Sequence, residues 1–514
     1  MSDSIQPSTW RRRQTLAAFV FSFAFIFSLA FSSGALFSGF QLTEDYQYLD
    51  THERLGRGET PSIVLNRYFH EDSKRIRLVW PLFVLQTKIF GTHIHLIRFL
   101  TVSMGALALF FLYLFGRGIR FGFLESILMG LLTVTGPYSY VWWRMQTHEN
   151  ICTLFMAAAL WAAAAERKWL FILSLLVMSW HKESYMVIVP ALLFLKLWLT
   201  KEKFSVSWAR AMRRNGVELL VLGLGLGAQM ALIVFVTGTL AGGYVGYEGL
   251  FWEKLTGAWI KLAQASHVEI WGALFLLALF STAGIFKNRS IRRQSLAGMF
   301  VFFVLLVAPQ LVLFQKTGIR GHYVLPGVFG FWFVFFYTYF LIKDSLRPVQ
   351  KLLLAALVGY LCWAQTAAAF ESGVAFKNEG AIVSGLVQSV KNSTRPDDPI
   401  LMVVDPGRHL EWSWAAKRYL ESFARRQNLW LFPIIRPNYS EREKYLTYQS
   451  PLSPLRVYQG RTLRNLPNPE NLAAIVVFPT SEIWFLSASH AWFNKYAYDR
   501  KMIGSFTLYT KKTE

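Results

Sequence analysis

Two adjacent carboxylates, Glu44 and Asp45, follow the first long apolar run of the chain. A carboxylate can accept a proton from an attacking hydroxyl as a general base, or it can bind a divalent cation. Adjacent acids disfavour each other's ionisation, which favours one of them as a base near neutral pH. The alternative is ordinary solvated loop charge. We therefore treat the pair as the first candidate site, with catalysis and cation binding both open.

A second polar cluster, Arg144-Met-Gln-Thr-His-Glu-Asn150, precedes another apolar run and follows several Tyr and Trp residues. His148 and Glu149 could bind sugar hydroxyls, assist the base, or hold a divalent metal together with Glu44 and Asp45. The alternative is a capped helix start with an acid near its positive end. The aromatic residues fit a membrane-interface belt as well as a sugar platform.

Two later clusters carry cations suited to phosphate. Lys182 lies in the segment His181–Ser184, and Arg320 lies in Lys316–Pro326, where it is flanked by glycines that permit close backbone approach. The alternatives are neighbouring interfacial charges and snorkelling toward lipid headgroups. Further candidates are Arg75 and Arg77 for phosphate, and His181 and His322 for substrate.

The composition predicts a polytopic α-helical membrane protein. Of the 514 residues, 54% are hydrophobic and 16% are charged, which is more apolar side chain than one soluble core can bury. The formal charge of +22 comes mostly from short Lys and Arg clusters between apolar runs, so we interpret it as a topology signal and exclude nucleic acid as a partner. Cys152 and Cys362 lie in apolar runs and support neither a disulfide framework nor a Cys-based metal site.

A membrane-spanning helix needs about 20 apolar residues. We expect eleven such helices, near 15–38, 96–116, 121–137, 149–165, 169–181, 184–199, 217–237, 269–286, 294–314, 323–342 and 351–369. The fifth is short for a free span. If it dips in and returns together with the sixth, the sidedness of the later loops is unchanged.

Basic loop residues are retained on the cytoplasmic side of a membrane. From a cytoplasmic N-terminus at Arg11–Arg13, alternate crossings place every later short basic cluster on the same side. Glu44–Asp45 and the C-terminal segment then lie on the opposite face. We expect a membrane domain at 1–370, whose outer loop 39–95 carries interfacial helices, and a small extracytoplasmic α/β domain at 371–514.

Together these features resemble the GT-C superfamily of integral-membrane glycosyltransferases. The resemblance covers the membrane domain and rests on the early acidic pair, on the long first outer loop, and on the segments RIRLVWPLFVLQTKIFG, HKESYMVIVP and RGHYVLP. The group includes protein O-mannosyltransferases, aminoarabinose transferases and O-antigen-modifying glucosyltransferases. It implies residence in a bacterial inner or plasma membrane and a polyprenyl-phosphate-linked sugar as donor.

The resemblance also implies roles for particular residues. Asp45 matches the catalytic base, with Glu44 second, although the family pattern is often Asp-Asp or Asp-Glu. The late Arg-x-x-Tyr pattern falls on Arg320 and Tyr323 and implies contact with the donor phosphate. The expected reaction is inverting transfer of a hexose or pentose to a hydroxyl of a glycan, lipid-linked glycan or protein. No cofactor is implied beyond the divalent metal left open above.

Two other functions are compatible with a polytopic chain. One is a membrane glycan polymerase or ligase, which usually relies on Arg and His in large late outer loops. The other is a non-enzymatic flippase or transporter of lipid-linked glycans. Transporters commonly contain internal repeats around a site at the membrane midplane, and this sequence shows no repeat.

Overall fold

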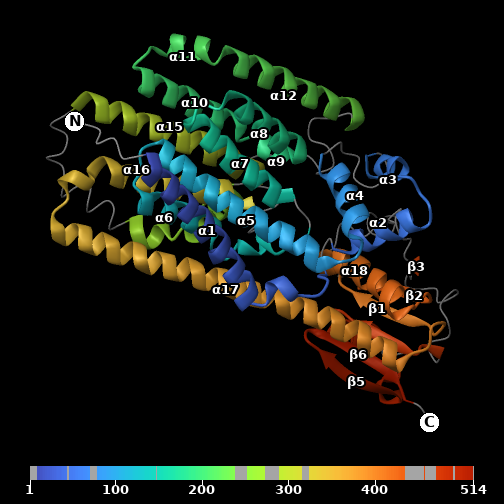
Figure 1. Cartoon of the computed structure of the whole chain (residues 1–514). Coiled ribbons are helices and arrows are strands. Elements are labelled where there is room, and N and C mark those ends of the chain that lie inside the picture. The colour runs from blue at the N-terminus through green and yellow to red at the C-terminus, as the bar shows by residue number, and fades with distance from the viewer. Residues whose placement is uncertain are drawn as a thin grey trace. The chain divides into compact units, whose positions relative to one another are not determined.

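The computed structural model describes residues 8–42, 45–69, 78–145, 148–237, 252–272, 289–314, 323–434, 456–457, 471–489 and 493–512 (Figure 1). The chain forms two compact units. The first, here the helical unit, contains Met1–Leu36, Arg75–Val79 and Ile97–Val374. The second, here the sheet unit, contains Phe37–Lys74, Trp80–Leu96 and Ala375–Glu514. We predicted a change of domain near residue 370; the units change within one long helix, and the second also contains first-loop residues.

The helical unit consists mainly of apolar helices. They are α1 (Ser8–Ser32), α5 (Ile94–Gly118), α6 (Phe123–Val134), α7 (His148–Ala164), α8 (Lys168–His181), α9 (Glu183–Met186), α10 (Val189–Phe204), α11 (Trp208–Arg214), α12 (Gly216–Thr237), α13 (Trp252–Ala265), α15 (Arg289–Phe314), α16 (Leu325–Ile342) and α17 (Pro348–Ser393). In the described part of the chain, seven helices are long and apolar enough to cross a membrane. The length and composition of these helices agree with the predicted polytopic α-helical membrane protein.

Ten of the eleven predicted ranges contain a helix, and the eighth, 269–286, lies largely outside the described residues. Since seven of the described helices are long and apolar enough to cross a membrane, the count of eleven spans stays a prediction. The last predicted range, 351–369, is only the first part of α17, which runs on to Ser393. The residues from 370 to 393 contain no proline. A helix therefore continues through them without a break.

Side-chain contacts join helix ends that we predicted to share one side of the membrane. The contacts are Arg117–Gln14 (3.3 Å), Lys343–Glu125 (3.1 Å), Lys203–Glu166 (2.5 Å) and Lys168–Glu218 (3.8 Å). Because Glu166 precedes α8 and Lys203 ends α10, the two helices leave this charged end and return to it. This return is the arrangement under which the predicted sidedness of the later loops would hold, and the sidedness itself stays a prediction.

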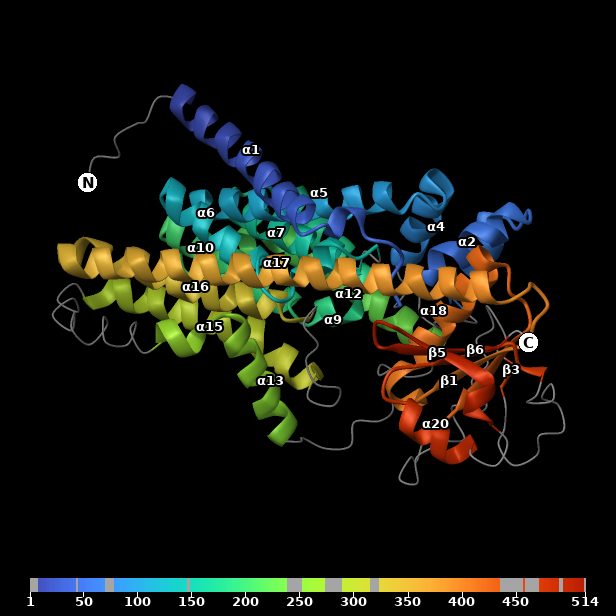
Figure 2. The same cartoon turned by 90° about the horizontal axis from the view of Figure 1, so that it is seen from below.

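The sheet unit contains a six-stranded mixed sheet in the order β3-β2-β1-β4-β6-β5. The strands are β1 (Ile400–Val404), β2 (Leu429–Pro433), β3 (Arg456–Val457), β4 (Ala474–Val477), β5 (Tyr498–Ile503) and β6 (Phe506–Lys511). Strands β1 to β4 pair in parallel, and β6 pairs antiparallel with both β4 and β5. Helix α18 (Pro406–Ala424) and the end of α17 pack on one apolar face, and α20 (Glu482–Ser489) packs on the other. Figure 2 shows α20 beside the sheet.

At the sheet surface, Glu482 accepts hydrogen bonds from Arg500 and from the phenol of Tyr509 (2.6 Å). The Arg500 hydrogen bond is the main cause that lowers the pKa of Glu482 from 4.5 to about 2. Burial, followed by the bond to Glu482, raises the pKa of Tyr509 from 10.0 to about 12.

We expect Glu482 to stabilise the sheet fully above about pH 4.5 and to lose that contribution as the pH falls toward 2, because a lowered acid pKa favours the ionised folded state. Tyr509 should lose its contribution as the pH rises from about 10 to about 12. Melting of the solubilised protein across pH 2–6 checks the first window. Glu482→Gln should flatten the profile there, and an unchanged profile would contradict the assignment.

The first-loop residues of the sheet unit form α2 (Tyr46–Gly56), α3 (Pro61–Arg67) and most of α4 (Val79–Phe90). Helices were expected in the loop 39–95, and α4 is one of them, with Pro81 in its first turn. It buries Phe83 and Val84 and exposes Leu82, Leu85 and Ile89. A helix with one packed apolar face and a second exposed apolar stripe is suited to lie at a membrane interface.

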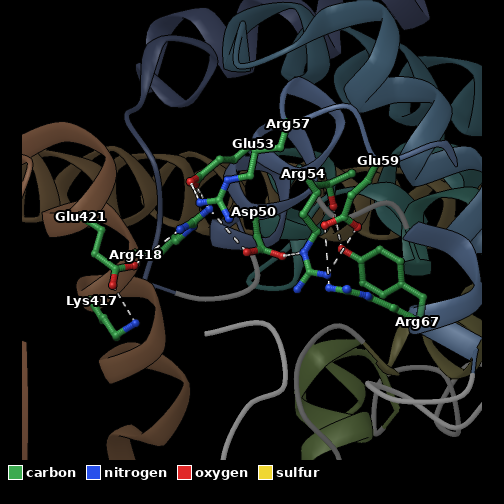
Figure 3. A network of polar contacts seen from close by, with 11 residues as sticks. Asp50, Glu53, Arg54, Arg57, Glu59, Arg67, Lys417, Arg418 and Glu421 are labelled. Atoms are coloured by element: carbon green, nitrogen blue, oxygen red, sulfur yellow. Dashed lines mark hydrogen bonds and ion pairs between the residues drawn. The ribbon is translucent and has the colours of Figure 1, made fainter. Parts of the chain in front are cut away.

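A charged network joins α2 to α18 within the sheet unit (Figure 3). Arg418 forms ion pairs with Asp50 (3.4 Å), Glu53 and Glu421 (3.5 Å), and Asp50 also pairs with Arg54 (2.7 Å). Burial raises the pKa of Asp50, and the two guanidinium groups oppose that shift. The guanidinium groups of Arg54 and Arg418 thereby offset the negative charge of the buried Asp50 carboxylate.

Arg418→Met should destabilise the sheet unit by about 2–4 kcal/mol, because it leaves Asp50 buried with one fewer cation. The matched control is Arg57→Met, since Arg57 is 68% exposed and pairs with Glu53, which is itself 38% exposed. That change should cost less than about 1 kcal/mol. Melting temperatures of the two variants in one detergent make the comparison, and equal shifts would show that the network adds nothing beyond surface pairing.

Candidate functional site

In the helical unit, three of the predicted clusters meet at one point. Lys182, between α8 and α9, forms an ion pair with Glu149 at the start of α7. The same ammonium lies 4.5 Å from the centre of the Tyr323 ring, just before α16. The Lys182 and Glu149 side chains are only 11% and 12% exposed. Residues separated by about 140 positions in the sequence thus share one largely buried charged site.

Two histidines adjoin this ion pair. His148 precedes Glu149 on α7, and His181 is the last residue of α8; their ring centres are 6.0 Å apart. Both are buried, His181 fully. Helices α7 and α8 form an antiparallel hairpin, which brings the start of one beside the end of the other. The predicted substrate candidates His148, Glu149 and His181 therefore come together with Lys182 and Tyr323.

The fixed positions of these side chains follow from their helices. The backbone C=O of Met178 accepts a contact from the Cys152 thiol at 3.5 Å, which ties α7 to α8 one turn away from the site. The Thr153 and Tyr185 hydroxyls lie 3.1 Å apart and link α7 to α9. Lys182 itself has extended backbone, so it interrupts the helical path between α8 and α9.

Chemically, the cluster offers a cation over an aromatic ring beside a carboxylate. An ammonium is a compact charge that can bind a phosphate oxygen, and ring contact adds attraction without neutralising it. Its pairing with Glu149 holds the ammonium in place before any ligand arrives. A purely structural ion pair would have the same static geometry. A double substitution of Lys182 and Glu149 distinguishes a structural role of Lys182 from phosphate binding.

In the sheet unit, Asp45 stands directly before α2 and is 2% exposed. Its Oδ2 accepts the backbone N–H of Gln41 at 3.0 Å, closing the turn between the apolar helix and α2. Burial, and then the charge of Asp45, raises the pKa of Tyr48 well above its ordinary value. Tyr48 therefore stays protonated and donates to Gln86 at 3.0 Å. Asp45 is thus a rigidly held carboxylate with one oxygen occupied by the backbone.

The other predicted site residues cannot be compared with this geometry. Glu44, Arg75, Arg77, Arg320 and His322 lie outside the described residues. Within the ranges that the structure describes, no group of three or more His, Cys, Asp or Glu residues has the geometry to hold a metal ion. The metal set Glu44, Asp45 and Glu149 includes one residue beyond those ranges and stays a prediction.

Sequence reasoning missed the residues that hold the turn before Asp45. Glu379 on α17 accepts the backbone N–H of Leu42 at 3.1 Å, and Tyr419 on α18 donates to the backbone C=O of Gln41. Tyr419 is fully buried. Nothing in the spacing of two residues more than 330 positions downstream signals contact with the first loop. Only the amphipathic character of their helices was visible.

No protein-family model matches this chain, and no curated protein matches it.

Proposed function

We propose that this chain is a glycosyltransferase that moves a sugar from a polyprenyl-phosphate-linked donor to an acceptor hydroxyl at the outer face of a membrane. The observation that carries the proposal is the meeting of Lys182, Glu149 and Tyr323 in one buried cluster. Lys182 and Tyr323 come from two of the segments on which the resemblance to GT-C glycosyltransferases rests, and Glu149 comes from a further polar cluster that we predicted to be functional. Their convergence is expected for a phosphate site and is not required of three unrelated interfacial side chains.

In the proposed reaction, the acceptor oxygen attacks the anomeric carbon while the bond from that carbon to the phosphate oxygen breaks. Asp45 takes the acceptor proton, and the lipid phosphate leaves as an anion. Since the leaving group is already stable as an anion, it needs charge stabilisation more than a general acid. Lys182 would supply that charge, with Arg320 as its partner. One-step displacement inverts the anomeric configuration.

The proposed sidedness follows from the charged helix ends. The ends joined by Lys203–Glu166, Lys168–Glu218 and Lys343–Glu125 carry the basic clusters that membrane insertion retains in the cytoplasm. The start of α7, which contains Glu149, and the end of α8, which Lys182 follows, lie at the opposite ends of these helices. The proposal accordingly assigns the cluster, the first loop and the sheet unit to the extracytoplasmic side of a bacterial inner membrane.

Purified protein in liposomes containing a polyprenyl-phosphate sugar tests the proposal. Transfer predicts release of free polyprenyl phosphate together with a glycosylated acceptor hydroxyl. Movement of unmodified donor lipid into the other leaflet, without release, would instead support a flippase and would overturn the proposal. Because acceptor identity is open, water and a mixture of simple glycosides serve as the first acceptors.

A further inference from the structure

The backbone before Asp45 is held by residues from the C-terminal part of the chain, all within the sheet unit. The Gln41 side-chain amide donates to the backbone C=O of Phe376 at 3.1 Å, and the Ser38 hydroxyl donates to the same carbonyl at 3.1 Å. Glu379 accepts the Leu42 N–H, and the Tyr419 phenol donates to the Gln41 C=O. The segment Ser38–Leu42 thus has fixed partners on both α17 and α18.

A glycine allows this segment to approach α17 closely. A Cβ at Gly380 would lie 2.7 Å from the backbone N of Gly39 and 3.0 Å from the Gln41 side-chain amide. Real Cβ atoms do not approach a backbone nitrogen so closely, so any side chain at position 380 would displace the segment. A Cβ at Gly39 would in turn lie 3.1 Å from the carbonyl oxygen of Gly380. The two backbones are therefore in direct contact.

The held segment and Asp45 form one connected unit. The backbone C=O of Gln41 accepts a hydrogen bond from the Tyr419 phenol, and the backbone N–H of Gln41 donates to the Asp45 carboxylate, so one residue links Tyr419 to Asp45. A shift at Tyr419 is transmitted through a single residue to the carboxylate. In enzyme sites, a misplacement of about 1 Å can cost on the order of a hundredfold in rate.

We infer that Tyr419 and Glu379 are positioning residues that set the orientation of the Asp45 carboxylate for catalysis, and that Gly380 is the contact point that makes this possible. The inference rests on the proposed function of Asp45. It assigns to the end of α17 and to α18 a catalytic support role, beyond forming one side of a sheet domain.

The test compares Tyr419→Phe with Tyr498→Phe in the purified full-length protein. Each change removes one buried phenol that donates to a backbone carbonyl in the sheet unit, since Tyr498 donates to Leu472 at 3.0 Å. Of these two tyrosines, Tyr419 is the one that hydrogen-bonds to the segment before Asp45. Tyr419→Phe should lower kcat by about tenfold to a hundredfold with KM for the lipid donor unchanged, and Tyr498→Phe should leave both unchanged.

A double-mutant cycle identifies the route of the effect. In an Asp45→Asn background, Tyr419→Phe should cause little further loss, because it acts through the carboxylate that has already been changed. Full additivity of the two losses would overturn the positioning role. Equal losses for Tyr419→Phe and Tyr498→Phe would also overturn it and would indicate general destabilisation of the sheet.

Hydrogen exchange gives a readout that does not depend on activity. In Tyr419→Phe and in Gly380→Ala, amides of Gln41 and Leu42 should exchange at least tenfold faster while amides of β1 and β4 stay protected. Unchanged exchange at Gln41 and Leu42 would show that the contacts with Tyr419 and Gly380 do not hold the segment in place. A further outcome is faster exchange in the variants with no release of polyprenyl phosphate by the wild-type protein. In that case the proposed function fails, and the catalytic part of this inference fails with it.

Discussion

Asp45→Asn should reduce sugar transfer by at least a hundredfold while folding and membrane insertion stay normal. A positioned general base contributes on the order of 10²–10⁴ in rate, and an amide cannot accept the proton. The asparagine oxygen can still accept the Gln41 N–H that Asp45 accepts at 3.0 Å. The substitution therefore removes the chemistry and keeps the turn. Initial rates of polyprenyl phosphate release measure the effect.

Two further variants make the Asp45 result specific. Asp45→Ala removes the turn contact as well and should lower both activity and the melting temperature. Asp398→Asn is the matched control, because Asp398 also accepts a backbone N–H, that of Arg395 at 2.6 Å, but lies outside the first loop. It should retain full activity. Near-normal transfer by Asp45→Asn would mean that this carboxylate only closes a turn.

Lys182→Gln should lower transfer by about a hundredfold, mainly by weakening stabilisation of the departing phosphate. The change leaves Glu149 12% exposed without its ion pair, so some loss could come from the abandoned carboxylate rather than from the phosphate. Lys168→Gln is the matched control, since Lys168 also pairs with a carboxylate, that of Glu218, and lies over an aromatic ring, that of Trp169. It should keep most of the activity.

The double variant Glu149→Gln with Lys182→Gln separates the two roles of Lys182. A structural ion pair replaced by two neutral amides should restore packing and with it the activity. A phosphate-binding lysine should leave the double variant as inactive as Lys182→Gln alone. Recovery in the double variant would contradict the assignment of Lys182 to the donor phosphate.

The helices were predictable because apolar length is a strong and local signal. The start of α7 at His148 and the end of α8 at His181 fall within one residue of the predicted ends, where polar clusters interrupt the apolar runs. The strand β5 was not predictable, because only its two end residues are buried. An edge strand with four exposed residues in a row shows no alternation that could reveal it.

The site was predictable in its members but only partly in its geometry. Topology placed the segments of Glu149 and Lys182 on one side, yet their direct pairing depends on α8 being short enough to end beside the start of α7. Tyr419 and Glu379 were not predictable, because their contacts are to backbone atoms of Gln41 and Leu42. A backbone partner leaves no requirement for a complementary residue type, and so no pattern in the sequence.

One measurement tests the central claim most directly: the rate of polyprenyl phosphate release by wild-type protein, Asp45→Asn and Lys182→Gln, prepared in parallel and matched for folding. The account predicts release by the wild-type protein with inversion at the anomeric carbon, and losses of about a hundredfold in each variant. Equal rates in all three, or no release by a folded wild-type protein supplied with donors of several sugars, would contradict it.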